Sequence, residues 1–114
     1  MALPTPIPEP LVELIAERFR VLGEPMRIRA LDQLRAIGEA SVGELAVALG
    51  TSQQNVSKHL AALHTANVVS RRREGNRVIY AISDPSVLAI CEVVCGSLER
   101  RAGEISDLFA EAAA

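Results

Sequence analysis

Several features that mark common protein classes are scarce in this sequence of 114 residues. It has no tryptophan, one tyrosine and two phenylalanines, so its core must be built from Leu, Val, Ile and Ala, which suits packed helices. Its two cysteines do not make the disulfide framework of a small secreted domain. No apolar run approaches the ~20 residues that a membrane span needs. The length fits one domain with one modest core.

Signatures of export and of catalysis are also missing. The first ten residues, MALPTPIPEP, lack the basic segment and long apolar core of a secretory signal. The sequence shows no paired nucleophile and base, no glycine-rich phosphate loop and no cofactor fingerprint. We therefore expect a cytoplasmic protein that has no membrane partner and is not an enzyme.

Charge is distributed unevenly along the chain. The formal net charge is −2, yet residues 51–80 carry five basic residues and one acidic residue, which leaves seven basic and thirteen acidic residues elsewhere. A basic segment on an acidic protein is expected where one face meets a polyanion, although a solvated charge run would look the same.

Periodicity and punctuation predict a mainly α fold with a small β-hairpin. The proline-rich residues 1–10 are expected to form a flexible arm, residues 11–105 one domain, and residues 106–114 a C-terminal tail. Phe19 belongs to the apolar stripe of the first helix, and Ile37 to the residues of the second helix that are expected to face inward. Ser41 with Glu44 forms a capping box. Strands are expected at 68–73 and 77–82 around the turn EGN. Helices are expected at about 10–22, 25–37, 42–49, 53–66 and from 85 to about 105.

The helix after Ser52 has two different faces. At 100° per residue, Val56, Leu60 and Leu63 share one arc that can dock on a core, while the polar residues are concentrated at the N-terminal end. Gln and Asn read adenine, and Lys reaches guanine or phosphate, so this face suits the major groove; a capped, solvated surface helix is the alternative. The residues assigned to DNA are Ser52, Gln53, Gln54, Asn55, Ser57 and Lys58.

The hairpin that follows supports the same interpretation. Two short helices, a tight glycine-containing turn and a basic hairpin together form a winged helix-turn-helix. Arginines beside a glycine turn suit phosphate contacts and the narrow minor groove, and we assign Arg73 and Arg77 to DNA. Arg71 shares the strand face of Arg73, and its role, like that of Arg72, stays open. Charged side chains also protect an exposed edge strand from aggregation, and both roles can hold together.

These segments resemble the ArsR/SmtB family of bacterial repressors. The resemblance rests on AERFRVLGEPMRIRALDQL (16–34), GTSQQNVSKHLAALHTANVV (50–69) and RRREGNRVIYAIS (71–83), and it spans most of residues 16–98. It implies a dimer held by the first and last helices, an inverted-repeat operator, and release from DNA when an effector binds. It also implies that Gln53, Gln54, Ser57 and Lys58 touch the major groove and Arg77 the backbone or minor groove.

The resemblance does not identify the effector. The family has a metalloid site made of cysteines, a zinc-type site and a thiol switch made of two cysteines, and this sequence matches the full ligand set of none of them. His59 and His64 are better explained as hydrogen-bonded or solvated imidazoles than as ligands. Cys91 and Cys95 lie one helical turn apart and could bind As(III) or another thiophilic ion such as Cd(II) with a third ligand from elsewhere. They could equally be small core residues. A non-metal effector, or none, also remains open, and so does a winged-helix protein–protein interaction module.

Overall fold

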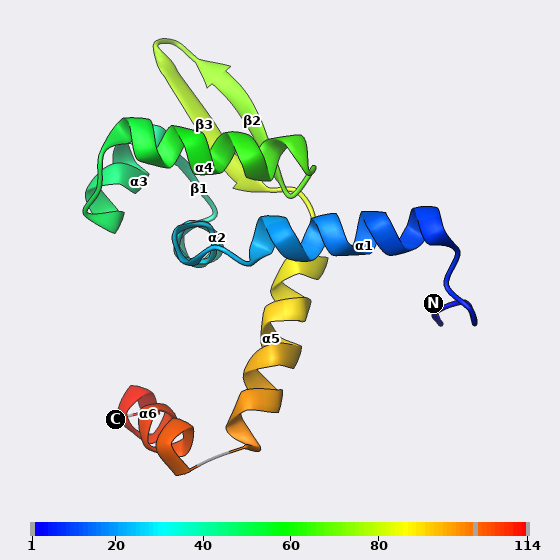
Figure 1. The fold of residues 1–114 in the computed structure, drawn as a ribbon. Helices are drawn as coiled ribbons and strands as arrows, with labels where there is room; N and C mark the ends of the chain where they lie inside the picture. The colour runs from blue at the N-terminus through cyan, green and yellow to red at the C-terminus, as the bar shows by residue number, and fades with distance from the viewer. Residues whose placement is uncertain (1, 102, 114) are drawn as a thin grey trace. The chain divides into compact units, whose positions relative to one another are not determined.

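In the computed structural model, the described residues are 2–101 and 103–113, and they fall into two compact units. Residues 1–84 form the first unit, which holds four helices and a three-stranded sheet (Figure 1). Residues 85–114 form the second unit, which contains two helices. None of the described helices is both long and apolar enough to cross a membrane.

The first two helices each have a proline in their first turn, as the sequence predicts. Helix α1 spans Glu9–Leu22 and helix α2 spans Pro25–Ile37, each with a proline in its first turn, where the missing N–H costs nothing. The Glu24 carboxylate caps α2 by accepting a 3.1 Å hydrogen bond from the backbone N–H of Arg27.

Two short helices then form the helix-turn-helix. Helix α3, Val42–Leu49, starts with the expected capping box, in which Ser41 and Glu44 satisfy each other's backbone N–H groups. It ends at Gly50, whose φ of 65° is left-handed and favours glycine. Helix α4, Gln53–Thr65, follows after Thr51 and Ser52.

A small antiparallel sheet completes the first unit. Strands β1 (Glu39–Ser41), β2 (Val69–Glu74) and β3 (Arg77–Ile82) lie in the order β1-β3-β2. The hairpin of β2 and β3 projects beside α4, and its turn contains Gly75 at a φ of 63° (Figure 1). The sequence predicted the hairpin but not β1, which is too short to show an alternating pattern.

The core lies between α2, α3, α4 and the sheet. Helices α2 and α4 supply the largest share of fully buried side chains. The apolar arc predicted for α4 is confirmed, because Val56, Leu60 and Leu63 are at most 1 % exposed. The expectation for Ile37 is wrong, because its side chain is 54 % exposed. Phe19, in the apolar stripe of α1, is also 56 % exposed. Periodicity identifies an apolar stripe, but it does not say whether the same chain covers every residue of that stripe.

The second unit divides the last predicted helix in two. Helix α5 spans Ser86–Glu99 and helix α6 spans Gly103–Ala113, with the two packed against each other. Uninterrupted helix to about 105 was therefore wrong, since glycine at 103 opens a separate element. Residue 102 and the side chain of Ile105 lie outside the described part of the chain.

Candidate nucleic-acid interface

The N-terminal half of α4 presents polar side chains to solvent. Gln53, Gln54, Ser57 and Lys58 are all exposed, and no hydrogen bond or ion pair is recorded for Gln54 or Lys58 within the described residues. The exposed polar face predicted from the sequence is thus present, and its donors and acceptors are available to a ligand.

Two of the predicted residues also have local structural roles. The Ser52 hydroxyl caps α4 by accepting a 3.1 Å hydrogen bond from the backbone N–H of Asn55. The Asn55 amide in turn donates to the Thr51 hydroxyl at 3.1 Å, and Asn55 is half-buried. These bonds fix the start of α4, so Ser52 and Asn55 are less free to reach a ligand than Gln54 and Lys58.

The opposite face of α4 holds a buried histidine. The Nδ1 atom of His59, whose side chain is 9 % exposed, accepts a 3.2 Å hydrogen bond from Nε of Arg27 in α2. Burial lowers the pKa of His59, and the Glu24 carboxylate, 3.5 Å from Nδ1, opposes that shift without cancelling it. A neutral imidazole therefore joins α4 to the first turn of α2, as the hydrogen-bonded interpretation of His59 anticipated.

This buried imidazole predicts a pH-dependent stability. Because the pKa of His59 is lower in the fold than its unfolded value of about 6.5, the unfolded chain binds the proton more readily. The stabilisation is fully present above about pH 6.5 and is lost as the pH falls from there toward the folded pKa. Urea denaturation at pH 7.5 and pH 5.5 measures it, with His59→Gln as the comparison. Equal pH dependence in the parent and the variant would contradict the prediction.

On one face of the hairpin, the basic side chains are paired with acids. Arg72 donates to both carboxylate oxygens of Glu39, at 2.7 and 2.9 Å, and to Glu74 at 2.9 Å. The Glu39 bond raises the pKa of Arg72, and Arg72 lowers the pKa of Glu39. Arg77 pairs with Glu44, whose pKa is lowered mainly by the backbone N–H and hydroxyl of Ser41. The capping carboxylate of α3 thus also holds Arg77.

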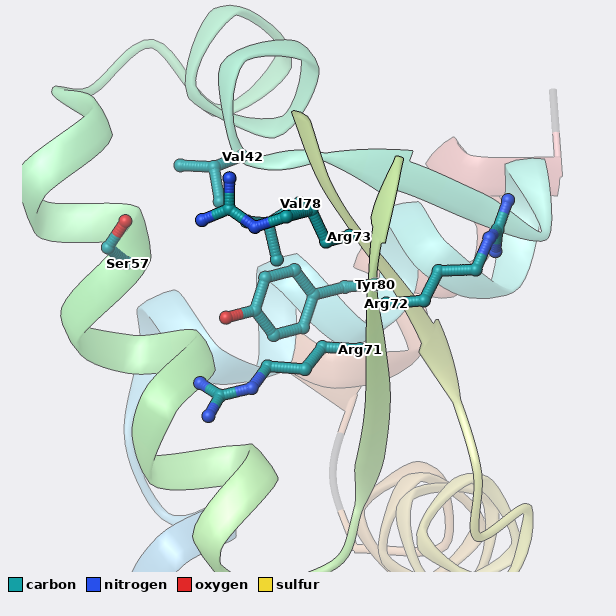
Figure 2. A pocket seen from close by; sticks show the side chains of 7 residues that line it. All are labelled: Val42, Ser57, Arg71, Arg72, Arg73, Val78 and Tyr80. Atoms are coloured by element: carbon teal, nitrogen blue, oxygen red, sulfur yellow. The ribbon is translucent and has the colours of Figure 1, made fainter. Parts of the chain in front are cut away.

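On the other face of the hairpin, Arg71 and Arg73 point toward α4. They lie opposite Tyr80 and Val78 in the β2–β3 register, so all four side chains share one face of the sheet. Together with Ser57 of α4 they border a hollow of about 420 Å³, whose lining also includes Val42 and Arg72. Figure 2 shows both guanidinium groups on the side of the sheet that faces Ser57, while Arg72 points the other way.

The structure thus groups the predicted residues differently from their order in the sequence. Ser57 and Arg73 border the same hollow, whereas Arg77 lies on the far face with Glu44. Arg71, which the sequence left unassigned, joins Arg73, and Tyr80 forms part of the same surface. Alternation along β2 already indicated that Arg71 and Arg73 share a face; which face meets α4 depends on the sheet's packing, which no local pattern reveals.

The two cysteines lie on α5, away from the residues described above in sequence. Both are free thiols, with Cys91 half-buried and Cys95 exposed. Among the residues that the structure describes, no three His, Cys, Asp or Glu side chains are grouped so that they could hold a metal ion. A soft ion at this pair would need a further ligand from outside the described chain.

Comparison with known sequences points to one family. The family model described as "Bacterial regulatory protein, arsR family" matches residues 24–71. An uncharacterized HTH-type transcriptional regulator of Mycobacterium tuberculosis, Rv0081, is 40% identical over 107 residues, which cover 90% of this chain and 93% of the relative.

Solved structures agree with the sequence comparison. The crystal structure of M. tuberculosis Rv0081 matches with a TM-score of 0.71 and 36% identity, over 94% of this chain and 100% of that chain. The homodimeric winged helix-turn-helix DNA-binding domain Mb0332 of Mycobacterium bovis gives 0.73 and 29%, over 91% and 95%. The antimony-specific transcriptional repressor AntR gives 0.68 and 33%, over 79% and 80%. The resemblance covers the winged helix-turn-helix and extends beyond it.

Proposed function

This chain belongs to the ArsR family of bacterial regulatory proteins, and we propose that it is a homodimeric transcriptional repressor that binds an inverted-repeat operator in double-stranded DNA. The observation that carries the proposal is the exposed polar face at the start of α4. The N-cap at Ser52 and the buried apolar face of the helix hold α4 in place, so this polar face is directed to solvent. A repressor of this kind acts in the cytoplasm, where a bacterial chromosome lies, and has no catalytic step.

In this proposal α4 is the recognition helix. Its N-terminal residues enter the major groove, where Gln53 and Gln54 can donate to and accept from adenine together. Ser57 and Lys58 follow one turn later and reach a base edge or a phosphate. Ser52 and Asn55 contribute through the geometry of the first turn, because their side chains are already engaged there.

The hairpin is the wing of the motif. Arg73 is exposed and has no recorded carboxylate partner in the described part of the chain, so its charge is available to DNA. Arg77 is paired with Glu44, but both side chains are more than half exposed, and such pairs contribute little in water. Arg77 can therefore exchange Glu44 for a phosphate near the hairpin turn.

A homodimer places two recognition helices on one side of the duplex. Mb0332, which this chain resembles, is a homodimeric DNA-binding domain. Helix α5 supports the same assembly because Val93, Val94 and Leu98 are exposed apolar residues, which a second copy would cover. Half-sites are then expected about one helical turn, or 34–36 Å, apart.

Quantitative DNA binding tests this proposal directly. Fluorescence anisotropy would measure the affinity of the intact protein for duplexes from the region upstream of its own gene. We expect one duplex that contains an inverted repeat to bind at least about a thousand times more tightly than a duplex of the same composition in scrambled order. Equal affinity for both duplexes would contradict sequence-specific repression.

For the effector, we propose a thiophilic ion at Cys91 and Cys95. Thiolates select soft ions, and two thiols one helical turn apart can bind the same ion. AntR, which this chain resembles, is an antimony-specific repressor, and this supports the chemical class. With two thiolates per chain, the remaining ligand comes from the partner subunit or from solvent. An ion there would alter the spacing of the two recognition helices through the dimer.

Titration of the DNA complex with soft ions tests the effector proposal. As(III) or Cd(II) is expected to release the parent protein from its operator, whereas a Cys91→Ser/Cys95→Ser variant should stay bound. Ser97→Ala, on the same helix, is the matched control and should respond like the parent. If no soft ion releases the parent, or if the double variant responds equally, the repressor uses a non-metal effector or none.

A further inference from the structure

The hollow between α4 and β2 carries an unbalanced positive charge. Four arginines lie on the hairpin, and the β2–β3 register divides them between its two faces. Figure 2 shows the three on β2, with Arg71 and Arg73 directed to one face and Arg72 to the other. Arg72 and Arg77 are paired with Glu39, Glu74 and Glu44 on one face. On the face that borders the hollow, Arg71 and Arg73 have no recorded carboxylate partner among residues 2–101 and 103–113. Two adjacent, uncompensated guanidinium groups favour an anion.

The chemistry of the surrounding side chains narrows the kind of anion. Ser57, on the recognition helix, adds a hydroxyl from the opposite side of the hollow, and the buried Tyr80 also lines it. In Figure 2 the Tyr80 hydroxyl is directed toward α4, as are the two guanidinium groups. Guanidinium forks and hydroxyls are the side chains that hold phosphate oxygens. The hollow is also bordered by two elements that DNA would meet together, the recognition helix and the wing.

We propose that this hollow is a phosphate-binding site, in which Arg71, Arg73 and Ser57 hold one backbone phosphate of the bound duplex. The inference rests on the proposed DNA-binding function and assigns a role to Arg71, which the sequence left open. A single phosphate gripped from β2 and from α4 links the wing to the recognition helix. It therefore fixes how α4 is rotated in the major groove, so the contact positions the base-reading side chains although it reads no base itself.

The site predicts a specific pattern of variant effects. Arg71→Ala/Arg73→Ala should weaken operator binding by about tenfold or more, since charge-assisted hydrogen bonds are lost. Because both arginines grip the same phosphate, the slope of log affinity against log salt should become less steep by about one contact per protomer of the dimer, and not by two. Arg72→Ala is the control, because it removes an arginine of the same strand whose side chain points away from the hollow. Arg71→Lys/Arg73→Lys keeps the charge and removes the fork, and it should recover the slope but only part of the affinity.

Phosphates that are neutralised one at a time identify the contact. Operator duplexes that each carry one methylphosphonate are compared with the unmodified duplex. At one position per half-site, the methylphosphonate should weaken binding of the parent but leave the affinity of the Arg71→Ala/Arg73→Ala variant unchanged. If the variant remains as sensitive as the parent at every position, or if Arg72→Ala has the same effect as the double variant, the inference is overturned while DNA binding itself stands. Failure of the parent to bind any duplex would instead overturn the proposed function.

Inorganic phosphate distinguishes the DNA backbone from a free anion. If the site is specific for a phosphate of bound DNA, inorganic phosphate at a few millimolar should not bind to the DNA-free protein. The main-chain amide NMR signals of Ser57, Arg71 and Arg73 should then stay unshifted. Saturable shifts of these signals, together with no position in the methylphosphonate set that depends on the two arginines, would show that the hollow binds free phosphate and would overturn the assignment to DNA.

Discussion

Leu60→Ala is expected to lower the free energy of unfolding by roughly 2–5 kcal/mol, the range for truncating a buried leucine. Leu60 is 0 % exposed and lies on the face of α4 that packs on the core. Its loss removes apolar contacts and leaves a cavity between α4 and the helices it packs against. Because the recognition helix is held mainly by this face, the variant should also bind DNA more weakly near its unfolding midpoint.

The matched control for Leu60→Ala is Val47→Ala in the preceding helix. Val47 is 85 % exposed, so its truncation removes almost no buried apolar surface. The free energy of unfolding should therefore change by no more than about 0.5 kcal/mol. Urea denaturation followed by circular dichroism measures both variants. A similar loss in the two variants would show that α4 is not docked through this face.

Gln54→Ala is expected to relax base preference at one position of each half-site, at a cost of ~1–3 kcal/mol for the preferred base pair. Gln54 is exposed in the first turn of α4 and has no recorded partner within the described residues, so its amide is free to pair with a base edge. Affinity for scrambled DNA should stay unchanged, because the substitution removes no charge and leaves the fold intact.

Binding to a panel of operators with single base-pair changes measures the effect of Gln54→Ala. Thr65→Ala serves as the control, because Thr65 is also exposed on α4 but lies at its last turn. The preference of Thr65→Ala should equal that of the parent at every position. An unaltered preference in Gln54→Ala would place the base contacts on other residues.

Local patterns in the sequence predicted much of the fold. The helix starts at Ser41 and Ser52 were predictable because capping depends on side chains only three residues away. The hairpin was predictable from alternation on either side of Gly75. Strand β1 was not, because its three residues become a strand only by pairing with β3, about 40 residues later in the chain.

The exposure of some candidate site residues was predictable for the same physical reason. The exposure of Gln54 and Lys58 follows from their position opposite the apolar arc of α4, which the helical period determines. The division of the arginines does not follow from any local pattern, because Glu39 and Glu44 are 33 residues away from Arg72 and Arg77. Likewise, Phe19 and Ile37 belong to apolar stripes, but whether this chain covers them depends on tertiary packing.

The salt dependence of operator affinity tests the central claim, that the polar face of α4 and the basic wing bind DNA, most directly. Anisotropy titrations between about 50 and 200 mM salt give the slope of log affinity against log salt. Lys58 and the arginine pair of β2 should each neutralise one phosphate in each protomer of the dimer. The slope should therefore be steeper than about −3 for the parent. For Lys58→Ala it should be less steep by about one contact per protomer. A parent affinity that hardly changes with salt would contradict the claim and would indicate a winged-helix domain that binds another protein.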